Sequence, residues 1–305
     1  DFLERRLNTE INTDTARSEI RTEGKLKLKD YALDATLPQR MRDATASYLD
    51  TYTPFGAGNE VIPRQEAEQL AARCLDSDGP TVLLLTGVAG AGKSGVVREL
   101  IARLSSGSAP HLAFRVDHHL DCKSPQSFGK AITNREESPV ATLKGTSADR
   151  RSVLIVDQVD AVSEISGRNG ATKQAVLRLV DDARNFGNIV VVICCRTFAL
   201  ENDERLKSLK ESHGVENVDV QLLDWEATVK PLLTSKSIAT DFFSESQIAL
   251  LRLPLNLALF VETYDPRSPF FTSRSELFRR FLEKKRISIE ADSSITWGLI
   301  QPISR

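Results

Sequence analysis

The amino-acid sequence predicts an α/β fold in which a parallel sheet carries helices on both faces and is followed by a smaller helical domain. Two observations predict this fold. Short apolar runs recur along the chain at intervals that leave room for a crossover helix between them. The first of these runs leads into a glycine-rich stretch that begins at Gly87. With 305 residues, 41% of them hydrophobic, the chain has enough apolar material for a large core.

Five apolar runs are the predicted strands, and helical patterns alternate with them. The strands are predicted at residues 81–85, 111–116, 153–156, 189–195 and 218–223. The helices are predicted at residues 64–75 after Pro63, at residues 172–184, and after Lys93, where one face carries Val97, Leu100, Ile101 and Leu104. In such a sheet the ligand lies in the crevice at the carboxyl ends of the strands.

The sequence divides into three predicted parts. Residues 1–60 are charged and weakly patterned, which predicts helices and a linker, and residues 61–224 form the predicted P-loop nucleotide-binding domain. Beyond Trp225 the strand signals stop and helical patterns follow, so residues 225–305 are predicted to be a helical domain. Because the sequence starts at Asp1 rather than at Met, we expect a fragment of a longer protein.

The stretch from Gly87 to Ser94 fits the phosphate-binding pattern G-x-x-x-x-G-K-[ST]. Backbone N–H groups of such a loop and of the helix that follows can surround the negative charge of a nucleotide triphosphate. Lys93 is predicted to bridge the β- and γ-phosphates, and the Ser94 hydroxyl to take one position around Mg²⁺, which prefers hard oxygen ligands. The residues predicted to bind ATP here are Gly87, Val88, Ala89, Gly90, Ala91, Gly92, Lys93, Ser94 and Gly95.

Two acids and an arginine follow later strands of the predicted sheet. Asp157 ends the apolar run at residues 153–156 and is the predicted Mg²⁺ carboxylate, and Asp160 is the predicted catalytic base for the attacking water. Arg196 follows the next strand, where its fork of donors can sense a γ-phosphate. Each residue also has a structural interpretation: Asp157 can cap a core strand, Asp160 can cap a helix, and Arg196 can be a solvated strand end.

Composition excludes several other classes of protein. The net charge of −2 gives no general attraction to nucleic acid or to an anionic membrane, and the longest apolar runs are far shorter than a membrane span of about 20 residues. The basic residues between 276 and 286 form one face of a predicted helix whose other positions are apolar, which favours a solvated helix face over a nucleic-acid contact. The four cysteines show neither disulfide nor zinc spacing, so we expect a cytoplasmic protein.

The order of these motifs resembles the STAND class of P-loop signal-transduction ATPases, in particular the NACHT-like members of bacterial anti-phage defence. The resemblance rests on GVAGAGKS, on VLIVDQVDAV followed by SGRN, on CCRTFALENDERL and on LRLPLNLAL. It implies that Lys93 and Ser94 are the Walker A pair, that Asp157 and Asp160 are the Walker B acids, and that Arg196 is the sensor arginine. It also implies that Pro254 lies against the adenine, that the segment up to Arg64 closes over the base, and that a winged-helix domain begins within residues 225–305.

The resemblance further implies an ATP-binding and ATP-hydrolysing switch that forms a homo-oligomer on activation. Oligomerisation would control an effector domain on the N-terminal side, and a protein trigger, such as a phage protein, would be sensed by a region on the C-terminal side. Two alternatives from other classes are an AAA+ or origin-loader-like ATPase that remodels DNA or protein, and a nucleotide-binding scaffold with little hydrolysis. The remodelling ATPase would have an acid directly after Asp157, where this chain has Gln158, and Ala161 keeps the scaffold open because the family often has an acid there.

Overall fold

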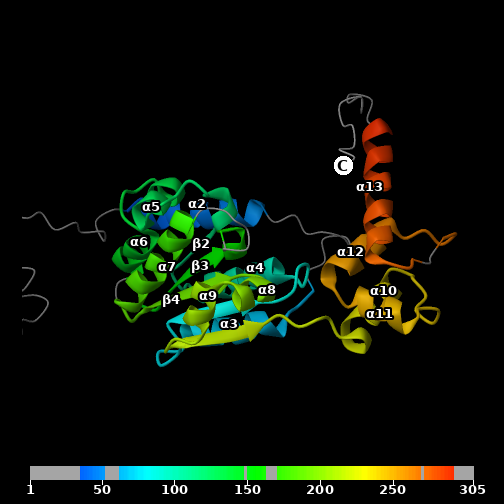
Figure 1. Cartoon of the computed structure of the whole chain (residues 1–305), viewed down its shortest axis with the longest axis horizontal. Helices are drawn as coiled ribbons and strands as arrows, with labels where there is room; N and C mark the ends of the chain where they lie inside the picture. Colours follow the sequence, from blue (N-terminus) through cyan, green and yellow to red (C-terminus); the bar gives the residue numbers. More distant parts are fainter. Residues whose placement is uncertain (1–34, 52–61, 148–149, 163–169, 269–270, 292–305) are drawn as a thin grey trace, which may run out of the picture.

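The computed structural model describes residues 35–51, 62–147, 150–162, 170–268 and 271–291 (Figure 1). Of the predicted N-terminal segment 1–60, only residues 35–51 therefore fall within the described part of the chain. Within the described residues, no helix combines the length and the apolarity that a membrane span requires.

Five parallel strands form one sheet in the order β2-β3-β4-β1-β5, so the predicted fold class is confirmed. The carboxyl ends of the strands come level at one edge, since Leu85 pairs with Cys194 and Arg115 with Asp157. β1, β3 and β4 are fully buried, as expected for apolar strands covered on both faces. The strands are β1 (Val82–Thr86), β2 (His111–Arg115), β3 (Ser152–Asp157), β4 (Ile189–Cys194) and β5 (Val215–Asp219).

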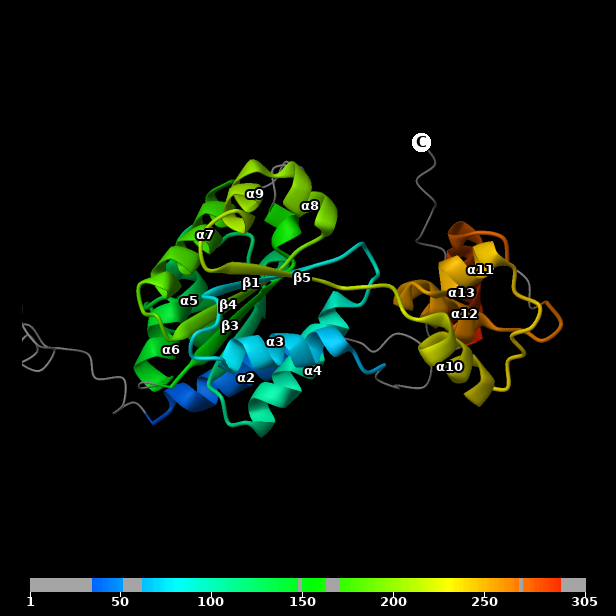
Figure 2. The ribbon, with the colours of Figure 1, turned by 90° about the horizontal axis from the view of Figure 1, so that it is seen from below.

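Helices cover both faces of the sheet (Figure 2). Each face has its own apolar core. On one face α3 (Gln65–Leu75) and α4 (Lys93–Ser106) pack on the side chains of Leu83 and Ile155. The other face carries α5 (Pro125–Thr133), α6 (Pro139–Ser147), α7 (Gly170–Arg184) and α9 (Glu204–Lys210). The short elements α8 (Thr197–Asn202), Val116–His118 and Val159–Val162 follow the carboxyl ends of strands.

Helix α2 (Leu37–Asp50) belongs to this core, although the sequence placed it in a separate helical and linker segment. It packs along β2, the edge strand, with Met41 in the core of one face and Tyr48 in the core of the other. Because α2 contributes to both cores, the packed domain begins earlier in the chain than residue 61.

The fifth strand lies at Val215–Asp219, and the prediction of a strand at residues 218–223 was wrong in its position. β5 is a half-exposed edge strand with few apolar residues, so its sequence carries a weak signal. The apolar residues that suggested the later position have other roles. Val220 packs beneath the glycine-rich loop, and Leu223 already belongs to the core of the helical region.

Beyond Trp225 the described residues form helices and loops that lie to one side of the sheet domain (Figure 1). These elements surround a third apolar core. Aromatic rings fill this core, with Phe260 5.5 Å from Phe243 and 5.1 Å from Phe271 between ring centroids. The helices are a π-helical turn (Trp225–Val229), α10 (Lys230–Ser235), α11 (Glu245–Leu251), α12 (Pro254–Thr263) and α13 (Arg274–Ala291). The predicted start of a winged-helix domain and the boundary at residue 225 remain predictions.

Candidate functional site

The glycine-rich loop joins the buried end of β1 to the first residue of α4. Gly90 and Gly92 have φ angles of 86° and 94°, values that residues with a side chain rarely adopt, so the conformation of this loop favours glycine at both positions. Gly92 is the N-cap of α4, and no side chain caps that helix. The N–H groups of its first turn are therefore available to an anion, which is the arrangement that phosphate requires.

Lys93 folds back over this loop. Its Nζ donates hydrogen bonds to the carbonyl oxygens of Gly87, at 2.7 Å, and Val88, at 3.2 Å. Burial lowers the pKa of Lys93, and the nearby carboxylates of Asp160 and Asp157 act in the opposite direction. A phosphate group would offer this ammonium a charged acceptor in place of two neutral carbonyls, and charge-assisted hydrogen bonds are the stronger kind.

Asp157 ends β3 and faces the start of α4. Its Oδ2 accepts a hydrogen bond from Ser94 Oγ at 3.4 Å, and its Oδ1 accepts one from the backbone N–H of Gln158 at 2.8 Å. Burial raises the pKa of Asp157, and its hydrogen bonds act against that shift. A hydroxyl oxygen and a carboxylate oxygen this close together fit two neighbouring positions of an octahedral Mg²⁺, so the residues present fit the predicted metal.

Asp160 and Arg196, which the sequence assigned to separate tasks, form an ion pair with each other. Arg196 Nε lies 3.0 Å from Asp160 Oδ2, and the arginine side chain is 55% exposed while the aspartate is 13% exposed. An ion pair with one partner this exposed stabilises the fold by about 1 kcal/mol or less, so it can open at little cost.

Arg64 is buried, and its hydrogen bonds connect the glycine-rich loop with neighbouring segments. Its guanidinium donates to both carboxylate oxygens of Glu66, to the Gln221 carbonyl at 2.6 Å and to the Ala91 carbonyl at 3.4 Å. The side chain thus ties the glycine-rich loop to the segment after β5. The predicted closure of the segment up to Arg64 over the nucleotide base remains a prediction.

The first turn of α12 rests directly on the glycine-rich loop. The Leu255 N–H donates a hydrogen bond to the Gly90 carbonyl at 3.2 Å, and a Cβ on Gly90 would lie only 2.9 Å from the Leu255 Cβ. Pro254 lies beside Gly92, where a Cβ would be 3.4 Å from its Cγ. The helical region therefore contacts the loop that is built to hold phosphate.

A cavity of about 260 Å³ brings together predicted residues from four parts of the sequence, whereas the predicted residues Gly87, Val88, Ala91, Asp157 and Arg64 do not line it. Leu255, Ala258 and Gln158 also line it, and the sequence did not single out these three as binding residues. A helical pattern alone predicts that Leu255 and Ala258 are buried, not that they face this loop. The lining residues are Ala89, Gly90, Gly92, Lys93, Ser94, Gly95, Gln158, Asp160, Arg196, Pro254, Leu255 and Ala258.

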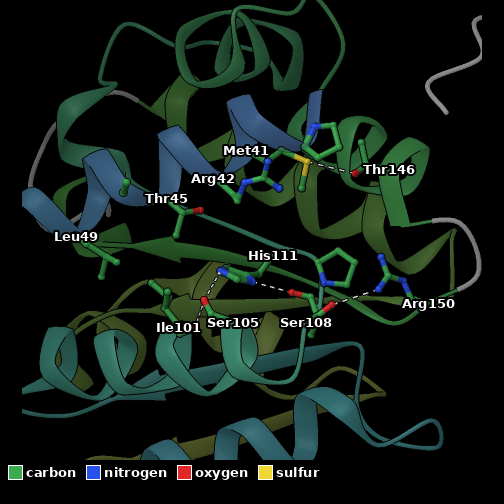
Figure 3. A pocket seen from close by; sticks show the side chains of 14 residues that line it. Met41, Arg42, Thr45, Leu49, Ile101, Ser105, Ser108, His111, Thr146 and Arg150 are labelled. Atoms are coloured by element: carbon green, nitrogen blue, oxygen red, sulfur yellow. Dashed lines mark hydrogen bonds between the residues drawn. The ribbon is translucent and has the colours of Figure 1, made fainter. Parts of the chain in front are cut away.

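A larger groove of about 560 Å³ lies elsewhere, between α2, α4 and β2 (Figure 3). It contains no residue of the glycine-rich loop, and its charged lining is Arg42 and Arg150, with His111 at its centre. Neither predicted acid reaches it. This groove is therefore separate from the candidate phosphate site.

A glycine-rich loop between a buried strand and a helix, with a buried carboxylate facing it, defines a P-loop nucleoside triphosphatase. Residues 83–211 match the family model described as "ATPase family associated with various cellular activities (AAA)". The matched segment runs from β1 through α9 and includes Lys93, Asp157 and Arg196. The chain is accordingly a P-loop ATPase that uses ATP with Mg²⁺, and its residues 83–211 are similar to the AAA family.

The chain is also similar in fold to several solved structures, of which three follow. AMPPCP-bound DnaA from Aquifex aeolicus has 12% identity and a TM-score of 0.45, with 78% of this chain and 72% of that chain covered. The FIGL-1 AAA domain in complex with ADP has 12% identity and a TM-score of 0.45, covering 83% and 95%. Domain III of the Thermotoga maritima replication initiation protein DnaA has 12% identity and a TM-score of 0.42, covering 76% and 98%. No curated protein matches the chain.

Proposed function

We propose that this ATPase is a nucleotide-controlled switch, in which the occupant of the P-loop sets the position of the helical region. The observation that carries the proposal is the contact of α12 with the loop, made by the Leu255 N–H on the Gly90 carbonyl and by Pro254 beside Gly92. One short loop thus serves both the nucleotide and the helical region. A ligand shifts such an equilibrium by its difference in affinity for the two arrangements.

Each predicted site residue keeps a proposed role within this switch. Lys93 and the N-terminus of α4 would hold the phosphates, and Ser94 and Asp157 would hold Mg²⁺. Asp160 would orient and deprotonate the attacking water, while Arg196 would contact the γ-phosphate.

In the described structure Asp160 and Arg196 engage each other. Both proposed roles therefore require this ion pair to open. We infer that the structure represents a resting arrangement with slow hydrolysis, in which the base and the sensor are both occupied.

Beyond the switch itself, we propose that the ATP-bound form assembles into a homo-oligomer that controls an attached effector in anti-phage defence, after a protein trigger is sensed. Support for this comes from the motif order that resembles NACHT-like STAND ATPases, and from the docking of α12 on the P-loop. A cytoplasmic location is part of the same proposal.

A remodelling ATPase with rapid turnover is the rival proposal, and the position after Asp157 separates the two. Gln158 occupies it, with a φ of 60° and its N–H bonded to the Asp157 carboxylate, so no acid stands there to act as a second base. This geometry favours slow turnover. The low-hydrolysis scaffold is the third candidate, because Ala161 stands where the ATPases that this chain resembles often carry an acid.

Amide hydrogen exchange at α12 tests the switch. We expect the Leu255 N–H to exchange at different rates with an ATP analogue, with ADP and without nucleotide, because its acceptor belongs to the P-loop. Calorimetry on the same samples establishes that nucleotide is bound. Equal exchange in all three samples would contradict the switch, and a multiple-turnover rate of many ATP per minute with equal exchange would favour the remodelling ATPase.

A further inference from the structure

One face of α2 carries a row of polar contacts to three different parts of the domain. Met41, Thr45 and Tyr48 are spaced so that they lie on the same helix face. Met41 Sδ accepts a hydrogen bond from Thr146 Oγ1 at 3.2 Å, and Thr45 Oγ1 accepts one from the Ala113 N–H on the edge of β2, also at 3.2 Å. Figure 3 shows Met41 and Thr45 on α2 beside the groove that separates α2 from α4.

The third contact reaches the candidate metal site. The Tyr48 hydroxyl donates a hydrogen bond to Asp157 Oδ2 at 2.9 Å, across 109 residues of sequence. Tyr48 is 5% exposed and packs in the core between the sheet and α4, so its ring has little freedom to turn away.

The Asp157 carboxylate is therefore held by three donors. Oδ1 accepts from the Gln158 N–H, and Oδ2 accepts from both Tyr48 and Ser94. The contact from Ser94 is longer, at 3.4 Å, than the contact from Tyr48, at 2.9 Å. Without the Tyr48 hydroxyl, Oδ2 would keep only the weaker of its two donors.

We propose that Tyr48 is a positioning residue of the magnesium site, whose hydroxyl orients Asp157 Oδ2 toward the position it shares with Ser94 Oγ. The proposal rests on the role proposed above for Asp157. Residues that orient a metal ligand commonly change metal affinity by about 10–100-fold when they are lost. Helix α2 is then part of the metal site, although it precedes the P-loop in the sequence.

A magnesium titration at fixed ADP concentration tests this role without any catalytic turnover. The half-saturating Mg²⁺ concentration is measured by calorimetry for the parent chain and for Tyr48→Phe, which keeps the ring and removes only the hydroxyl. We expect the half-saturating concentration to rise about tenfold in Tyr48→Phe, with ADP affinity in excess chelator unchanged. Tyr264→Phe is the matched control, because Tyr264 packs on Phe260 in the helical region and should leave the value unchanged.

Two further variants make each outcome decisive. Thr45→Val removes the hydrogen bond of α2 to β2 but leaves Asp157 and its donors in place. A shift equal to that of Tyr48→Phe would therefore assign the effect to helix packing and overturn the proposal. A parental value in Tyr48→Phe would overturn it as well. Asp157→Asn distinguishes the metal role of Asp157 from the positioning role of Tyr48. If the half-saturating Mg²⁺ concentration of Asp157→Asn is also parental, the proposed metal role of Asp157 is wrong. If it rises strongly in Asp157→Asn but not in Tyr48→Phe, only the role of Tyr48 is refuted.

Discussion

Arg196 Nε lies 3.0 Å from Asp160 Oδ2, so the proposed sensor and the proposed base neutralise each other in this structure. The two side chains follow neighbouring strands, since Arg196 follows β4 and Asp160 follows β3. Because Arg196 is mostly exposed, the pair is weak and a bound phosphate can compete for the arginine. Release of Asp160 would then accompany recognition of the phosphate by Arg196.

Asp160→Asn should bind ATP and fail to turn it over. The substitution keeps the shape of the side chain and removes the carboxylate that would accept a proton from water, while Lys93 and Asp157 are untouched. A multiple-turnover phosphate-release assay, run beside calorimetry of ATP binding, measures both parts. Hydrolysis at the parental rate would show that Asp160 only pairs with Arg196 and that the base lies elsewhere.

Lys93→Ala should lose about 2–3 kcal/mol of ATP binding free energy, the scale of charge-assisted hydrogen bonds left unmade. The Lys93 ammonium donates hydrogen bonds to the carbonyl oxygens of Gly87 and Val88, so the side chain reaches over the loop. Calorimetry with ATP and Mg²⁺ measures the loss. Lys144→Ala is the matched control, because Lys144 bonds Asn188 and lies outside the cavity. Equal affinity in Lys93→Ala and the parent would contradict the P-loop assignment.

Gly90→Ala should loosen α12 from the P-loop. The new Cβ would lie 2.9 Å from the Leu255 Cβ, and the φ of 86° is unfavourable for alanine by about 1–2 kcal/mol. We expect faster hydrogen exchange at the Leu255 N–H and a lower Tm, by about 2–4 °C for each kcal/mol lost.

Gly107→Ala is the control for Gly90→Ala. Gly107 ends α4 with a φ of −80°, and its Cβ would meet nothing closer than 3.5 Å. Parental exchange at Leu255 in Gly90→Ala would show that the close contact yields without moving α12.

The sequence predicted those parts of the site that are contiguous or lie at strand ends. Lys93 and Ser94 belong to one loop, and Asp157 follows an apolar run, so local patterns place all three at the same sheet edge. Contacts between segments that are distant in the sequence produce no such local pattern. Tyr48 and Leu255 each sit on an apolar helix face, and such a face predicts burial without naming the partner.

The ion pair of Asp160 with Arg196 and the position of β5 were missed for related reasons. Two charged residues at the ends of neighbouring strands can meet, but only the register between β3 and β4 decides that they do. β5 pairs through its backbone with β1 while its side chains are largely polar, so hydrophobicity favoured the segment that follows it.

Arg196→Ala should reduce the difference between ATP and ADP in binding and in the position of α12. The arginine is proposed to contact the γ-phosphate, which ADP lacks, so its loss should weaken binding of an ATP analogue by about 1–3 kcal/mol and leave ADP binding unchanged. Calorimetry with each nucleotide and Mg²⁺ measures this, and exchange at the Leu255 N–H should become similar in the two states. Arg42→Ala is the matched control, because Arg42 is exposed on α2, bonds Gln39 and lines the separate groove. If Arg196→Ala weakens ATP and ADP equally, Arg196 supports the fold of the site and does not sense the γ-phosphate.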